Sequence, residues 1–203
     1  MKVFSYILVL IGIAIIFFIF GPVIKQEMDY TFNQMAGVKY TVDKTGGWNA
    51  QRVIYPPNID FSIVIPKINA AAPIIDNVDP SNSTLYLRAL KDGVAHADGS
   101  AYPGEIGNIY LFAHSTDAFY NVGKYNAVFF LIGHLMPGDE IDIYYRGNLI
   151  KYTVFDKQIV EPTDTQYLGT LIDGEQTLTL QTCYPPGTTL KRLVVLAKKD
   201  STE

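Results

Sequence analysis

The chain has very little cysteine, histidine or arginine. Among its 203 residues there are one cysteine, Cys183, and three histidines. Zinc fingers and iron–sulfur clusters need several such ligands, so the composition excludes both kinds of site. The acidic residues Glu105, Asp117 and Asp139 do not have the spacing of a calcium-binding loop. The sequence therefore predicts neither a metal nor a cofactor.

Strong charge of either sign is also missing. Charged residues make up 18% of the chain and the formal net charge is −4. There is no basic run and no stripe of Lys and Arg interleaved with aromatics, so nucleic acid is not expected as a partner. Apolar residues reach 48%, which is typical of a packed core and argues against disorder.

Charge is absent from residues 3–20, and the apolar stretch continues to Ile24. At about 1.5 Å rise per residue, a helix of this length spans a hydrocarbon layer of roughly 30 Å. A cleaved signal peptide is the alternative, but it needs a shorter apolar region and a small-residue cleavage site. The residues after Phe20, GPVIKQEMDY, contain no such site. The sequence predicts an uncleaved membrane anchor over residues 1–24.

Flanking charges predict the orientation of this anchor. Lys2 precedes the apolar stretch, whereas Lys25, Glu27 and Asp29 follow it. The positive-inside rule then predicts a single-pass protein with a cytoplasmic N-terminus and the rest of the chain outside the cell. A lone cysteine in that compartment suggests a reactive thiol or an intermolecular disulfide, with an inert buried thiol as the alternative.

The remaining chain divides into a stalk over residues 25–57 and a domain over residues 58–200. KQEMDYTFNQMAG continues the helical pattern, and KTGGWN then interrupts it. Trp48 lies in this stretch, and the sequence does not decide whether it packs on the domain or covers a site.

Short strand patterns separated by turn signals dominate the domain. They are DFSIVIP, GNIYLFAHS, DEIDIYYRG, NLIKYTVFDKQIV, QTLTLQTC and KRLVVLAKK. Two helical stretches interrupt them, STLYLRALKDG over residues 83–93 with Ser83 as its cap, and NAVFFLIGHL over residues 126–135. This pattern predicts a mainly β fold, either a barrel or a sandwich, with short helices.

Strand alternation gives Cys183 an orientation. In TLTLQTC, the residues Leu178, Leu180 and Thr182 share one face, and Thr177, Thr179, Gln181 and Cys183 share the other. The leucines mark the core side, so Cys183 is expected on the polar face, where its thiol is accessible.

A nucleophilic thiol needs a proton acceptor and a group that stabilises the oxyanion. His114 follows a predicted strand and opens into a loop, where catalytic groups are common. His134 fits better as a cation at a helix C-terminus, and His96 in the loop GVAHADGS either supports a catalytic residue without touching substrate or is merely solvated. Arg192 begins the strand that follows Cys183, and a permanent positive charge there suits an oxyanion. Each of these residues taken singly is more often structural.

Taken together, these residues resemble the sortases, membrane-anchored cysteine transpeptidases of mainly Gram-positive bacteria. The sortase signature TLxTC is present as TLQTC, residues 179–183, and Arg192 matches the arginine one strand later. FAHS contains His114 where sortases often have AGH, so Ala113 replaces the usual glycine. Residues 65–74 and 90–115 are also similar to sortase segments, and the resemblance covers roughly residues 58–200.

The resemblance implies a sortase-like closed β-barrel and a catalytic set of His114, Cys183 and Arg192. Thr182 and His96 are further candidates for binding substrate or the oxyanion. The implied substrate is a surface protein with an LPxTG-like C-terminal sorting signal, and the implied acceptor is an amine such as a peptidoglycan precursor or a pilin lysine.

Two alternatives to this interpretation stay open. One is a membrane-tethered extracellular β-domain that binds a partner without catalysis. The other is a different extracellular cysteine enzyme, such as an L,D-transpeptidase, but no SHG-type segment precedes Cys183.

Overall fold

The computed structural model describes residues 2–38, 40–41, 52–115, 125 and 128–200. Trp48 and Asp117 lie outside these residues. The chain divides into two compact units, residues 1–38 and residues 39–203, which are treated separately below.

The first unit is one helix, α1, which runs from Lys2 to Met35. It continues beyond the apolar stretch, as the pattern of KQEMDYTFNQM predicts. Gly37 ends it with a φ of 65°, and the amide of Val38 donates to the carbonyl of Asn33. A left-handed glycine just past the last turn is a common way for a helix to end.

Among the residues that the structure describes, no helix is both long and apolar enough to cross a membrane, which does not support the span expected over residues 1–24.

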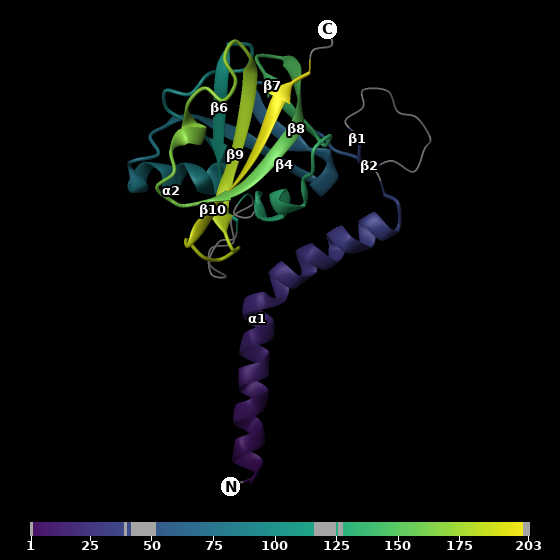
Figure 1. The fold of residues 1–203 in the computed structure, drawn as a ribbon. Coiled ribbons are helices and arrows are strands. Elements are labelled where there is room, and N and C mark those ends of the chain that lie inside the picture. The colour runs from purple at the N-terminus through teal and green to yellow at the C-terminus, as the bar shows by residue number, and fades with distance from the viewer. Residues whose placement is uncertain (1, 39, 42–51, 116–124, 126–127, 201–203) are drawn as a thin grey trace. The chain divides into compact units, whose positions relative to one another are not determined.

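The second unit is built around a closed barrel of eight strands (Figure 1). The strands are β3 (Phe61–Ile65), β4 (Ala70–Val78), β5 (Val94–Ala97), β6 (Gly107–Phe112), β7 (Glu140–Tyr145), β8 (Asn148–Val160), β9 (Gln176–Tyr184) and β10 (Lys191–Lys199). They close in the order β10-β8-β7-β3-β4-β5-β6-β9. The β4–β5 and β6–β9 pairs are parallel and the other pairs are antiparallel. The prediction of a mainly β barrel with short helices is confirmed.

A small parallel pair lies before the barrel in the chain. It consists of β1 (Tyr40–Thr41) and β2 (Arg52–Val53). Ile54 follows β2 and is buried against Val64 and Tyr144 of the barrel wall. This cover explains why Val64 of β3 is buried, whereas Ser62 on the same face donates its hydroxyl to the carbonyl of Asn58.

Aliphatic side chains from every second position fill the barrel. The largest fully buried ones include Ile63, Ile109, Leu111, Ile141, Ile143, Leu178 and Leu180. Leu178 and Leu180 pair with Ile109 and Leu111 across the parallel β6–β9 ladder. The leucines of TLTLQTC therefore mark the core side, as expected.

The helices agree with the sequence only in part. α2 (Ser83–Asp92) is confirmed, but its cap is Asn82, whose side chain accepts a hydrogen bond from the amide of Leu85 at 3.3 Å. The helix predicted over residues 126–135 is wrong in length and type, because its described part is a 3₁₀ helix, η2 (Phe130–His134). Further 3₁₀ helices are η1 (Pro66–Ile68) and η3 (Gln166–Leu168).

A lysine from the barrel wall holds the C-terminal end of η2. The ammonium of Lys157 on β8 donates to the carbonyls of Gly133 and Leu135. His134, the last residue of η2, lies at the cation-favouring end of this helix, as the sequence predicts.

Candidate active site

Cys183 and Arg192 lie directly opposite each other on neighbouring strands. The antiparallel β9–β10 ladder pairs them, between the pairs Tyr184 with Lys191 and Thr182 with Leu193. Side chains of directly opposed residues leave a sheet on the same face, with Cβ atoms about 4.5–5.5 Å apart. Both residues are partly exposed, and Cys183 is a free thiol. The structure brings these two predicted site residues together.

His114 follows β6, which runs parallel to β9. The ladder pairs Phe112 with Gln181, and the amide of Ala113 donates to the carbonyl of Gln181 at 3.1 Å. Extending this register by two residues sets His114 beside Cys183. His114 is partly exposed and also shares strand parity with Tyr110 and Phe112, whose side is opposite to that of the buried Leu111.

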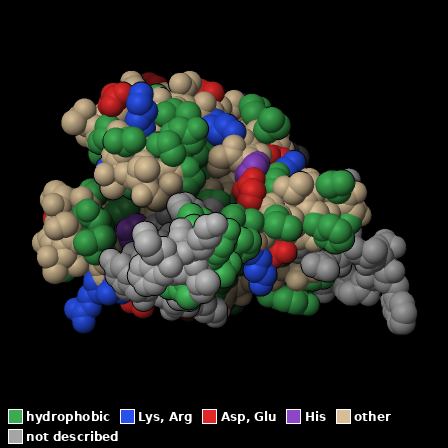
Figure 2. Space-filling view, turned by 90° about the horizontal axis from the view of Figure 1, so that it is seen from below, with side chains coloured by type: hydrophobic (Ala, Val, Ile, Leu, Met, Phe, Trp, Pro, Cys, Tyr) green, Lys and Arg blue, Asp and Glu red, His purple; other side chains and the backbone are tan. Residues whose placement is uncertain are grey.

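One side of the β6, β9 and β10 strands thus carries the candidate residues. We call it the outer face and define it by Tyr110, Gln181, Cys183 and Arg192. Because β6 and β9 are parallel, the end of β6 lies at the same end of the barrel as the β9–β10 connection (Figure 1). Figure 2 looks at this end of the molecule, where histidine and basic side chains are visible at the surface among hydrophobic ones.

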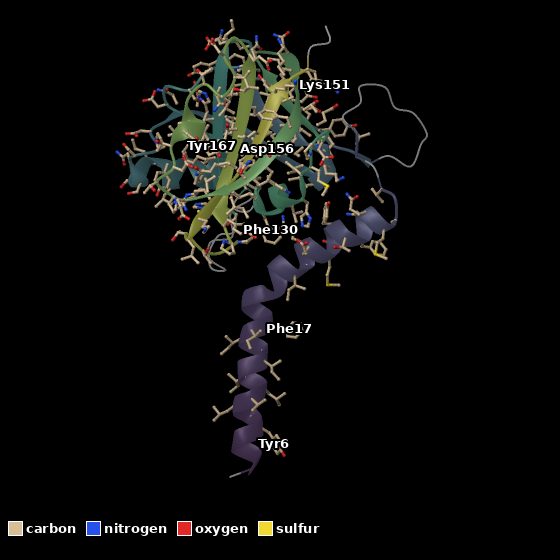
Figure 3. The ribbon with its side chains drawn as sticks, viewed as in Figure 1. Tyr6, Phe17, Phe130, Lys151, Asp156 and Tyr167 are labelled. Atoms are coloured by element: carbon tan, nitrogen blue, oxygen red, sulfur yellow. The ribbon has the colours of Figure 1, made fainter. Side chains whose placement is uncertain are left out.

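The outer face is exposed only near Cys183. Gln181 and Cys183 are partly exposed, as predicted, but Thr177 and Thr179 are fully buried. The η3 segment contacts Thr179, because the carbonyl of Tyr167 accepts hydrogen bonds from Thr179 Oγ1 at 3.4 Å and Asn108 Nδ2 at 2.7 Å (Tyr167 is labelled in Figure 3). Thr177 Oγ1 in turn donates to Asn108 Oδ1 at 3.2 Å. The polar face predicted for all four residues is therefore correct only for the last two.

Thr182 lies on the core side and links the two strands that carry the thiol and the imidazole. It is 3% exposed, and its hydroxyl donates to the carbonyl of Ala113 at 2.9 Å. The bond joins the residue before Cys183 to the residue before His114. This side chain holds the two strand ends in register, and it does not point toward the outer face.

Two backbone carbonyls, one in the connection before β10 and one at the first residue of β10, hold the guanidinium of Arg192. Its Nη1 donates to the carbonyls of Thr189 and Lys191, each at 3.1 Å. No carboxylate in the described part of the chain forms an ion pair with it. The turn itself is tight, since Thr188 donates its amide to the carbonyl of Pro185 at 3.0 Å and Gly187 has a φ of 80°.

The structure does not bring His96 to this group. His96 belongs to strand β5 and not to a loop, and it pairs with the interior residue Leu111. Its ring is fully buried, with Nδ1 3.2 Å from Asp76 Oδ1 and Nε2 2.9 Å from Ser100 Oγ. These contacts tie β4, β5 and the connection after β5 together inside the barrel, away from the outer face.

Sequence reasoning missed Tyr110, whose hydroxyl donates a hydrogen bond to Gln181 Oε1 beside the thiol. The sequence does contain an indication of this residue, because Tyr110 and His114 are an even number of positions apart and therefore share a face of the strand. Within the described residues, no group of three or more His, Cys, Asp or Glu side chains is placed to hold a metal.

Comparison with known proteins agrees with this geometry. The sortase domain model matches residues 63–200. Sortase D of Bacillus subtilis (strain 168) is 32% identical over 138 residues, which are 66% of this chain and 61% of that protein.

Solved structures match as well. Sortase C-1 from Actinomyces oris has a TM-score of 0.59 and 29% identity, covering 70% of this chain and 73% of its own. A Clostridium perfringens Sortase D5 transpeptidase has a TM-score of 0.57 and 28% identity, covering 73% and 82%. The domain model covers residues 63–200, which carry the whole outer face, and the chain belongs to the sortase family.

Proposed function

We propose that this protein is a cysteine transpeptidase whose catalytic domain spans residues 58–200. The observation that supports this most is the strand register, which sets Cys183 opposite Arg192 and, when extended, beside His114. A thiol, an imidazole and a guanidinium on one partly exposed face provide a nucleophile, a proton carrier and an oxyanion ligand.

The first half of the proposed reaction forms a thioester. With His114 protonated, the Cys183 thiolate attacks the Thr–Gly carbonyl carbon of an LPxTG-like sorting signal. Arg192 stabilises the resulting oxyanion, and the backbone amide of Thr182 is a second proposed donor. The intermediate collapses by breaking the C–N bond, and His114 gives its proton to the leaving glycine amine. A thioacyl enzyme remains.

The second half transfers the acyl group to an amine. His114 takes a proton from the incoming amine, whose nitrogen attacks the thioester carbon. The C–S bond breaks, which restores the thiolate and the imidazolium. We propose a surface protein as the acyl donor, and a peptidoglycan precursor or a pilin lysine as the acceptor at the cell surface.

The test uses the purified chain, a library of LPxTG-type peptides and an amine, with mass spectrometry of the intact protein. A mass increase equal to the peptide up to threonine is expected, and Cys183→Ala should abolish it. An adduct that persists in Cys183→Ala refutes the assigned nucleophile. If no peptide yields an adduct with the parent protein, the non-catalytic partner-binding alternative is favoured.

A further inference from the structure

A hydrogen bond on the outer face sets the orientation of a side chain next to the thiol. Gln181 lies two residues before Cys183 on β9, on the same side of the strand, and is partly exposed. Tyr110 on β6 is 4% exposed, and its hydroxyl donates to Gln181 Oε1. Burial raises the pKa of Tyr110, while the positive charge of Arg192 lowers it less, so the hydroxyl stays a donor at neutral pH.

The bond determines which end of the Gln181 amide is available. A primary amide has one acceptor oxygen and two N–H donors at its other end. Because the oxygen faces Tyr110, the nitrogen faces the opposite way. Nε2 donates to no acceptor among the residues that the structure describes. Two N–H groups are therefore unused on a partly exposed side chain.

The position of these donors suits a peptide that reaches the thiol. Residues two apart on a strand are separated by roughly 6.6 Å along the chain, which is also the spacing of alternate residues in an extended peptide. A peptide that runs extended along β9 with its scissile carbonyl at Cys183 would thus place a main-chain carbonyl near Gln181. Val194 of β10 flanks Gln181 on the other side with a buried aliphatic side chain.

We propose that Gln181 binds a main-chain carbonyl of the peptide substrate within about two residues of the scissile bond, and that Tyr110 is a positioning residue that aims the Gln181 amide. The proposal rests on the proposed transpeptidase function and assigns a substrate-binding group to the same site. A main-chain contact contributes affinity whatever the side chain of the substrate residue.

The decisive variant is the double substitution Tyr110→Phe with Gln181→Met. Gln181→Met alone leaves a buried hydroxyl without a partner, which costs stability in itself. Replacing both partners with apolar groups of similar shape is nearly neutral for folding. The double variant therefore removes the N–H donors and keeps the packing. Gln158→Met on β8 is the matched control, because Gln158 is exposed and its amide already donates to Asp156.

The measurement is the steady-state transfer of dye-labelled LPxTG peptides, with every residue represented at x, to an amine, together with the melting temperature. For the double variant we expect KM to rise about five- to tenfold with kcat unchanged, as for one lost hydrogen bond. Tyr110→Phe alone should raise KM about threefold, since the amide can then rotate. The melting temperatures should match that of the parent.

Two results would overturn this proposal alone, and a third would overturn it together with the proposed function. An unchanged KM in the double variant, with the parent active, shows that Gln181 does not contact the peptide and leaves the transpeptidase function intact. A fall in kcat at unchanged KM also excludes a binding role. Failure of the parent to form any thioacyl adduct instead refutes the proposed function, and this inference with it.

Discussion

Arg192 lies directly opposite Cys183, and its guanidinium donates hydrogen bonds to the backbone carbonyls of Thr189 and Lys191. Only Nη1 makes these contacts, so the remaining N–H groups of the guanidinium are free of protein partners in the described part of the chain. A guanidinium has five donors in a fixed plane, whereas an ammonium has three on a single nitrogen. Arginine is therefore able to bind its own loop and an oxyanion at the same time.

Replacing Arg192 with lysine should separate charge from geometry. Arg192→Lys keeps the positive charge, but its donors all lie on one nitrogen, so binding the oxyanion competes with binding the two carbonyls; we expect a loss of about tenfold or more in the rate of thioacyl formation. Arg192→Ala should lose about 10²–10³-fold, as for removal of one oxyanion ligand. Single-turnover mass spectrometry with a saturating peptide measures both rates.

The control for Arg192 is its neighbour, Lys191. Lys191 is exposed and pairs with Glu161 at 3.0 Å on the surface. Surface ion pairs of this kind contribute little. Lys191→Ala should leave the thioacylation rate within about twofold of the parent. An equal loss in Lys191→Ala and Arg192→Ala would contradict a specific role for Arg192.

Substitution of His114 should change turnover, whereas substitution of His96 should change stability. His114→Ala is expected to remove turnover and to leave the melting temperature close to that of the parent, because His114 is partly exposed at the end of a strand. His96→Ala should do the reverse. It leaves a cavity in place of a fully buried ring that contacts Asp76 and Ser100, and should cost about 2–4 kcal/mol of unfolding free energy.

Activity per folded molecule, measured beside thermal unfolding, separates these two effects. Full turnover in His114→Ala would contradict its proposed role and direct attention to His96 or His134. A stable, inactive His96→Ala protein would mean that this buried ring takes part in the chemistry.

Local pattern predicted the strands and the orientation of the thiol well, because both depend on side-chain alternation. The six strand patterns correspond to β3, β6, β7, β8, β9 and β10. Burial of Thr177 and Thr179 was missed, because strand alternation does not indicate that η3, in the connection before β9, folds back to contact Thr179 and Asn108. His96 was placed in a loop because β5 spans only Val94–Ala97 and its partners are remote in sequence.

The Tyr110–Gln181 bond is a similar case. The two residues are 71 positions apart, and only the parallel pairing of β6 with β9 brings them together. A single sequence indicates which residues share a strand face, but it does not indicate which strands become neighbours. The candidate set of His114, Cys183 and Arg192 could be predicted from family resemblance, whereas the neighbours Tyr110 and Gln181 could be identified only from the strand order of the barrel.

Gly93 should be one of the least replaceable residues of the fold. A Cβ atom there would lie 2.2 Å from the carbonyl oxygen of Pro73, on the adjacent strand β4. Backbone atoms cannot move aside cheaply, so Gly93→Ala should lower the unfolding free energy by about 2–4 kcal/mol. Gly169→Ala is the control, because its Cβ would make only an ordinary contact at 3.9 Å. Denaturant titration should show a change below about 1 kcal/mol for the control. Equal changes would contradict the steric explanation.

Asp142 is a buried carboxyl in the barrel wall. It is fully buried on β7, and neither carboxylate oxygen has a hydrogen-bond donor within reach among the described residues. Burial and the charge of Glu140 raise the pKa of Asp142 to about 7. The ammonium of Lys151 lowers the pKa, but it lies 4.0 Å from Asp142 Oδ1 and is closer to Glu140, at 2.8 Å (Lys151 is labelled in Figure 3). The negative charge of Asp200 raises the pKa of Asp142 further, by a smaller amount.

Asp142 should therefore make the protein less stable as pH rises from about 4 to about 7. The pKa of Asp142 is higher in the folded than in the unfolded chain, where it is about 3.9. Its stabilising contribution is complete below pH 4 and is lost as pH rises through about 7, with a slope of at most about 1.4 kcal/mol per pH unit. Asp142→Asn removes this slope and should unfold at higher denaturant concentration than the parent at pH 8. Glu140→Gln, which removes the neighbouring charge, should shift the transition to lower pH. Identical pH profiles for the parent and Asp142→Asn would show that Asp142 is ionised in the folded protein throughout this range.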